Sequence, residues 1–262
     1  MWLLKILCFV LSTACLGAAT DQGVTTDLND VLSRTSVQVT GFLDQFSDVK
    51  CTEHVVQEKF RVDGKVELRE ESTYDYLVIL TNNGGELSLD ESRLAVHEPK
   101  RDKKNTPLLV SNGFATLFLV FHPFYIESFN FAVVGQAISD GHTLVKVSFQ
   151  HIPATRTPAA LALRGREYPL ELSGVAWIEP QTGIITRIEA GIDNTLEDVG
   201  LKSLHSEVEF APAPFHDMKF PYWFPTVASV DVATPRQHWR NTHRFTDYKR
   251  FSVSTEEQVA SK

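Results

Sequence analysis

The stretch at residues 174–189, GVAWIEPQTGIITRIE, decides the fold. Two apolar runs, 174–179 and 184–192, flank the four residues Pro180-Gln181-Thr182-Gly183. Proline and glycine in such a short connection are typical of a tight turn, and the branched residues on both sides favour extended chain. The stretch therefore predicts an antiparallel hairpin.

The same pattern recurs along the chain. Asp63-Gly64 separates runs 52–62 and 65–80, and Asp140-Gly141 separates runs 125–137 and 142–151. Both dipeptides favour two-residue hairpin turns. Further strands are expected at residues 86–97, 203–211, 223–233 and 236–251, with a long ordered loop at 153–173. Hairpins at this spacing predict a single strongly curved antiparallel sheet, an unclosed β-barrel in a mostly β (α+β) fold.

Two segments predict helices that this sheet could wrap. Residues 26–47 carry one apolar stripe at three- and four-residue steps, formed by Leu28, Val31, Leu32, Thr35, Val39, Phe42, Leu43 and Phe46. Thr25, Thr26 or Asp27 can cap the start of this amphipathic helix. Residues 108–121 are almost continuously apolar and end before Pro123, which predicts a short buried helix or, alternatively, a buried strand.

The N-terminus predicts export. Lys5 precedes an apolar run at 6–16, and small residues follow at 17–19, the pattern of a cleaved signal peptide. We expect a signal peptide at 1–19, one domain at 20–252, a polar tail at 253–262, and no transmembrane segment in the mature chain. The expected location is the periplasm or the exterior. A form lipidated at Cys15 is the lesser alternative, because Ser12 stands where a branched apolar residue belongs.

Composition and motifs narrow the classes of function. A formal net charge of −8 argues against nucleic-acid binding, which needs a basic surface. Cys51 is the one cysteine beyond the signal, so an internal disulfide is excluded, and we expect a half-buried packing residue rather than a nucleophile. The chain contains no nucleophile elbow, zinc-protease motif or phosphate loop. The sequence predicts no enzyme, metal or cofactor, although catalytic residues gathered from distant strands remain an alternative.

Aromatic residues are the main candidates for a binding site. The chain has 17 Phe, many of them between residues 114 and 131. A curved sheet that closes over a helix can leave an apolar cavity lined by such residues. The predicted lining residues are Phe114, Leu117, Phe118, Phe121, Phe129, Phe131, Trp177 and Trp223.

The last predicted strand has an unusual cationic face. Alternation places Arg236, Arg240 and Arg244 together with His238 on one side, and Trp239, Asn241, His243 and Phe245 on the other. Tyr248 and Arg250 are also expected on the cationic side. Guanidinium groups bind phosphate and carboxylate, so Arg236, Arg240 and Arg244 are candidates for an anionic headgroup. The alternative is a solvated face paired with acidic residues of neighbouring strands.

The order of signal, amphipathic helix and antiparallel hairpins resembles the LolA/LolB-like superfamily of periplasmic lipoprotein carriers. The hairpin at 174–189 is similar to one that such proteins carry, in which an acidic residue and Pro precede Thr-Gly and Arg-Ile-Glu follows. The resemblance implies an unclosed barrel over helices, with an apolar cavity for acyl chains.

The sequence and the resemblance together predict a periplasmic binder or carrier of a lipid-like amphiphile. The expected partners are lipid or lipoprotein acyl chains, with an envelope protein as a second candidate. The alternative function is a non-enzymatic interaction or scaffold module of the envelope, in which side chains fill the core.

Overall fold

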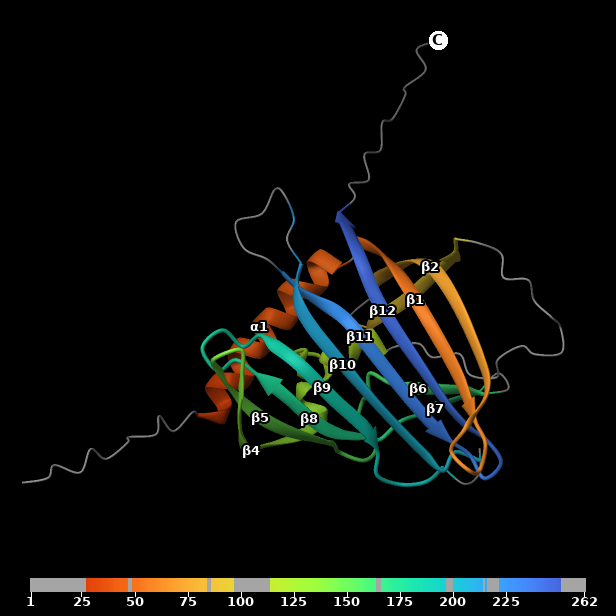
Figure 1. The fold of residues 1–262 in the computed structure, drawn as a ribbon. Coiled ribbons are helices and arrows are strands. Elements are labelled where there is room, and N and C mark those ends of the chain that lie inside the picture. Colours follow the sequence, from red (N-terminus) through yellow and green to blue (C-terminus); the bar gives the residue numbers. More distant parts are fainter. Residues whose placement is uncertain are drawn as a thin grey trace, which may run out of the picture.

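The computed structural model describes residues 27–46, 49–83, 86–96, 114–163, 166–196, 200–213, 215 and 222–250 (Figure 1). The predicted signal peptide and polar tail lie outside these ranges. The elements are α1 Leu28–Phe46, β1 Val49–Phe60, β2 Val66–Asn83, β3 Glu86–Ala95, two 3₁₀ helices η1 Phe114–Phe121 and η2 Ile126–Ser128, β4 Phe129–Ser139, β5 His142–His151, β6 Ala160–Leu163, β7 Arg166–Pro169, β8 Leu172–Ile178, β9 Ile185–Ile192, β10 Ser203–Ala213, β11 Tyr222–Ala233 and β12 His238–Arg250. None of the described helices is long and apolar enough to span a membrane.

Ten strands form one antiparallel sheet in the order β3-β2-β1-β12-β11-β10-β9-β8-β5-β4. The first and last long strands, β1 and β12, are neighbours, so the two ends of the domain meet inside the sheet. Figure 1 shows β2, β1, β12, β11 and β10 side by side, with α1 next to the β10 side. The sheet is not closed, because it ends at β3 and β4. The predicted curved, unclosed antiparallel sheet with an N-terminal helix is confirmed.

The helix α1 forms where the apolar stripe predicted it. Asp27 caps the first turn, because its Oδ1 accepts a hydrogen bond from Asn29 N at 3.0 Å. Four buried residues at steps of four face the sheet: Val31, Thr35, Val39 and Leu43. Helix propensity adds little to the stability of such a helix, which comes mainly from burying this stripe.

The core lies between the sheet, α1 and η1. Residues 117–121 of η1 are all buried, and aromatic rings from neighbouring elements pack around them. The short buried helix predicted for 108–121 is therefore a 3₁₀ helix over its second half, while residues 108–113 lie outside the described ranges. Leu, Val and Phe side chains are among those most often buried in proteins, which favours a central position for this apolar segment.

Three sequence expectations differ from the structure. The strand expected at 125–137 begins only at Phe129, because residues 126–128 form the 3₁₀ helix η2. The segment 153–173, expected to be a loop, contains the hairpin β6–β7 and the start of β8. The alternation of β12 also breaks near its end, where Asp247 adopts a left-handed conformation with φ +55°. This irregularity turns Tyr248 from the cationic face toward the core, where its ring lies 4.7 Å from that of Phe224.

Candidate functional site

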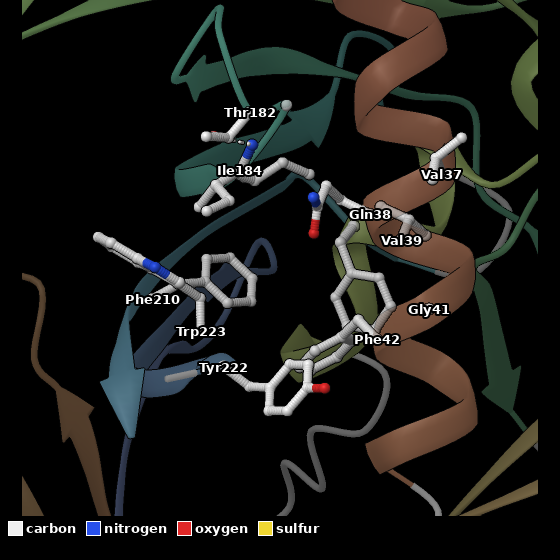
Figure 2. Close-up of a pocket in the computed structure, with 13 residues that line it drawn as sticks. Val37, Gln38, Val39, Gly41, Phe42, Thr182, Ile184, Phe210, Tyr222 and Trp223 are labelled. Carbon is white, nitrogen blue, oxygen red and sulfur yellow. Dashed lines mark hydrogen bonds between the residues drawn. The ribbon is translucent and has the colours of Figure 1, made fainter. Parts of the chain in front are cut away.

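A pocket of about 550 Å³ opens between the middle of α1 and the sheet. Figure 2 shows Gln38 and Phe42 of α1 facing Phe210 and Trp223 across this space, with Tyr222 below and Ile184 above. The volume lies in the range of about 300–1,000 Å³ that is usual for small-molecule sites. The lining residues are Val37, Gln38, Val39, Gly41, Phe42, Phe118, Thr182, Gly183, Ile184, Ile185, Phe210, Tyr222 and Trp223.

The helical wall contains Gln38, Phe42 and a glycine. Figure 2 shows the side chains of Gln38 and Phe42 pointing into the space, whereas Val37 points away from it and is 70% exposed. Gly41 lies one turn after Val37 on the same side of α1, and a Cβ there would meet no atom within 4 Å. Phe42 packs edge-on against Phe118 at 4.7 Å between ring centroids, so an aromatic contact fixes this wall.

A further wall of the pocket is the turn between β8 and β9, which contacts α1 directly. Arg34 Nη1 donates a hydrogen bond of 2.7 Å to the carbonyl of Pro180. Gly183 has φ +78°, and a Cβ there would lie 2.5 Å from the backbone of Arg34 and Thr35. Only glycine allows this contact, because it tolerates positive φ and has no Cβ. The turn predicted from the sequence thus sets the distance between helix and sheet at the pocket.

The chemistry of the pocket is apolar and uncharged. None of its described lining residues is charged, and five are aromatic. The polar side chains of the lining are Gln38, Thr182 and the phenol of Tyr222. A ligand inside this pocket would gain mainly from burial of apolar surface, and a charged group would find no opposite charge among these side chains.

The structure places two of the eight predicted cavity residues in this pocket, Phe118 and Trp223. Three more, Leu117, Phe121 and Phe129, are buried in the packed core. Phe131 is half-buried, with its ring 5.3 Å from that of Phe121. The side chain of Phe114 lies outside the described ranges.

Trp177 lies on the other face of the sheet. Its neighbours Ala176 and Ile178 are fully buried, so strand alternation directs the indole outward. Lys146 and Arg187 lie over the ring at 5.3 and 4.8 Å from its centroid, in an arrangement typical of cation–π contacts. Trp177 therefore lies away from the pocket and does not line it.

The three predicted headgroup arginines also lie away from the pocket. Arg240 and Arg244 are exposed, whereas the alternating residues Trp239, Asn241, His243 and Phe245 are buried, as the sequence predicted. Arg240 Nη2 lies 2.9 Å from Asp231 Oδ2. Arg236 is in the turn after β11, at the end opposite Trp223. The cationic face is therefore an outer face, and part of it is paired with an acidic neighbour.

A buried ionic cluster links the first and last strands of the domain. Glu53 of β1 is fully buried, and its carboxylate accepts hydrogen bonds from Arg93 Nε and Nη2 at 2.6 and 2.9 Å. Burial alone would raise the pKa of Glu53, but hydrogen bonds to His243 and Arg93 outweigh it, and the pKa lies below its ordinary value. Because these groups satisfy one another, we interpret the cluster as structural.

Cys51 is buried beside this cluster. Burial raises the pKa of its thiol to about 12, which keeps it protonated at neutral pH. A protonated buried thiol is a poor nucleophile, which agrees with the packing role expected from the sequence. In the described ranges, no three His, Cys, Asp or Glu side chains gather in a way that could hold a metal ion.

Several lining residues were missed at the level of sequence. Phe210 and Tyr222 stand near the ends of separate strands, and only the pairing of β10 with β11 brings them together. Gly41 could have been noticed in the sequence, because a glycine inside a regular helical pattern often has a packing or functional reason. The sequence signal for the ionic cluster was His243, an ionisable residue on the face of the last strand that also carries Trp239 and Phe245.

Comparisons with known proteins address the fold. No family model and no curated protein matches the chain. Among solved structures, it is similar to a DUF1329 family protein from Desulfovibrio piger, with 10% identity, 91% of this chain and 96% of that chain covered, and a TM-score of 0.44. A structure described as an outer membrane lipoprotein-sorting protein domain, from Vibrio parahaemolyticus, has 10% identity, coverage of 88% and 95%, and a TM-score of 0.41.

A third match is a LolA superfamily protein. It comes from Nitrosomonas europaea, with 11% identity, coverage of 89% and 97%, and a TM-score of 0.38.

Proposed function

We propose that the protein is a non-enzymatic binder or carrier of a lipid-like amphiphile, and that the pocket beside α1 holds its apolar part. The observation that carries this proposal is a space of about 550 Å³ lined by aromatic and aliphatic side chains, with no charged residue among them. An acyl chain meets the requirements of such a lining, because its binding energy comes from apolar surface removed from water. We place this activity in the periplasm or outside the cell, as the N-terminal sequence predicts.

The uncharged lining also limits which part of the ligand enters. A carboxylate or phosphate would lose its hydration inside the pocket without gaining a cationic partner there. The headgroup would therefore remain at the opening, near water. Arg240 points outward and pairs with Asp231, so we assign it no role in binding the headgroup.

The pocket can be narrowed with one substitution on the helix. Gln38 faces Phe210 and Trp223 across the space, so Gln38→Trp would fill part of it with an indole ring. Binding of a fluorescent polyene fatty acid should weaken by about tenfold or more, which corresponds to about 1.4 kcal/mol. Thr40→Trp is the matched control, because it adds the same side chain at another exposed position of α1.

Binding and stability must be measured on the same variants. Gln38→Trp should unfold at nearly the same urea concentration as the wild type, because Gln38 is exposed, so lost binding would reflect lost volume in the pocket. Equal affinity of wild type and Gln38→Trp for the fatty acid would contradict the proposed site. Failure of wild-type protein to bind this probe, together with the absence of lipid in extracts of protein purified from the cell envelope, would contradict the function.

A further inference from the structure

The two edges of the ten-stranded sheet are chemically different. At one edge, β3 carries the charged residues Glu86, Asp90, Glu91 and Arg93. At the other, β4 has eleven residues with the sequence FNFAVVGQAIS, which contains neither a charge nor a proline. Proteins commonly protect free edges with charges or proline, because unpaired N–H and C=O groups attract another strand. Of the two edge strands, β3 carries charges, whereas β4 has neither charge nor proline and is interrupted only by one irregularity, at Val134.

Exposed apolar side chains accompany the outer edge of β4. Val133, Val134 and Ile138 are 45%, 55% and 80% exposed. Val133 stands opposite buried Val147 of β5, so it continues the apolar inner face of the sheet to its edge. Val134 is the extra residue of an irregularity between Val133 and Gly135, which leaves two consecutive valines accessible. In the described part of the chain, β4 pairs with β5 alone.

We propose that β4 is an interaction surface for a second copy of this chain, with the two β4 strands pairing antiparallel about a two-fold axis. In such a pair each strand meets an identical strand, so a charged residue would face a like charge near the axis. The uncharged sequence of β4 avoids that repulsion, although the chain as a whole carries a formal charge of −8. Apolar contacts between the exposed valines and isoleucines would accompany the new backbone hydrogen bonds.

The overall charge gives this dimer a distinctive salt dependence. Two chains of charge −8 repel each other at low ionic strength, and added salt screens that repulsion. An uncharged contact contains no ion pairs for salt to weaken. Dimerisation should therefore strengthen as sodium chloride rises, whereas association through opposite charges would weaken.

Sedimentation velocity of the mature protein, between about 1 and 200 µM, tests the proposal. We expect a monomer–dimer equilibrium that shifts toward dimer with added salt. Val134→Lys and Ile138→Lys should each raise the dissociation constant by about tenfold or more, because the symmetric dimer carries each lysine twice. Leu94→Lys on β3 is the control, since Leu94 is 69% exposed at the opposite edge and its substitution should leave the dimer unchanged.

Circular dichroism of the lysine variants should match the wild type, because both substituted side chains are exposed. A wild type that stays monomeric at every concentration and salt level would overturn the proposal. A dimer that survives both lysine variants, or one that Leu94→Lys disrupts equally, would also overturn it. None of these measurements depends on a lipid, so their outcome does not decide whether the pocket beside α1 binds an amphiphile.

Discussion

Glu53 and His243 are 190 residues apart in the chain, and Glu53 Oε1 lies 2.8 Å from His243 Nδ1 inside the folded domain. The pair joins β1 to β12, the seam at which the first and last strands meet. Arg93 of β3 holds the other side of the same carboxylate, and its guanidinium lies 5.1 Å from the ring centroid of Tyr76 on β2. One buried carboxylate therefore connects residues from three strands, and Tyr76 of a fourth strand lies against the guanidinium of Arg93.

Loss of the Glu53 carboxylate should be costly. Removal of one member of a buried pair typically costs about 3–5 kcal/mol. Glu53→Ala takes the carboxylate from Arg93 and His243, but Arg93 keeps Glu91, whose Oε2 lies 2.9 Å from Arg93 Nη2. We therefore expect the free energy of unfolding in urea to fall by an amount near the lower end of that range. Glu67→Ala is the control, because it breaks the Lys59–Glu67 ion pair, in which Glu67 is the more exposed member. This substitution should cost less than about 1 kcal/mol. Similar losses for both variants would contradict the role given to the cluster.

The same carboxylate should make stability depend on acid pH. In the folded protein the pKa of Glu53 lies below its ordinary value of 4.5, because hydrogen bonds to His243 and Arg93 outweigh the opposing effect of burial. The unfolded chain therefore binds more protons in this range, and protonation favours unfolding. The stabilisation is present in full above about pH 4.5 and is lost as the pH falls through the folded pKa. Urea unfolding between about pH 3 and 7 should show a smaller acid-induced loss for Glu53→Gln than for the wild type.

The thiol of Cys51 should be unreactive until the protein unfolds. Its pKa is raised to about 12 by burial, so almost none of it is thiolate at pH 8. Ellman's reagent should therefore label native mature protein slowly and label protein unfolded in guanidinium at once. The measurement is simple, because Cys51 is the only cysteine after the predicted signal. Rapid labelling of the native protein would contradict the buried position and reopen a nucleophilic role.

Local patterns predicted the elements of the fold, and long-range register determined the site. The stripe around Val31 and Val39 and the Asp-Gly turns depend on neighbouring residues, so the sequence was enough to place the helix and hairpins. The pocket depends on Phe210 and Tyr222 meeting α1, which follows from strand pairing across the sheet. Tyr248 was assigned to the wrong face because positive φ at Asp247, which is not a glycine, has no clear sequence signal.

Two glycines in different turns allow the cost of backbone strain to be separated from the cost of contact with α1. Gly183 in the β8–β9 turn has φ +78°, and Gly64 in the β1–β2 turn has φ +80°. Alanine should be disfavoured at both by about 1–2 kcal/mol, the usual cost of a left-handed conformation for a residue with a Cβ. At Gly64 that cost should be the whole effect, because a Cβ there meets nothing within 4 Å.

Gly183→Ala should cost clearly more than Gly64→Ala, because its Cβ would stand 2.5 Å from Arg34 C and Thr35 N of the helix backbone. Either α1 or the turn must move, and both line the pocket. We therefore expect at least about 2 kcal/mol of additional destabilisation in urea, as overpacking of a rigid contact commonly produces. Affinity for a fluorescent fatty acid should change in Gly183→Ala and remain at the wild-type value in Gly64→Ala. Equal stability and equal affinity of the two variants would mean that the turn does not fix the spacing between α1 and the sheet.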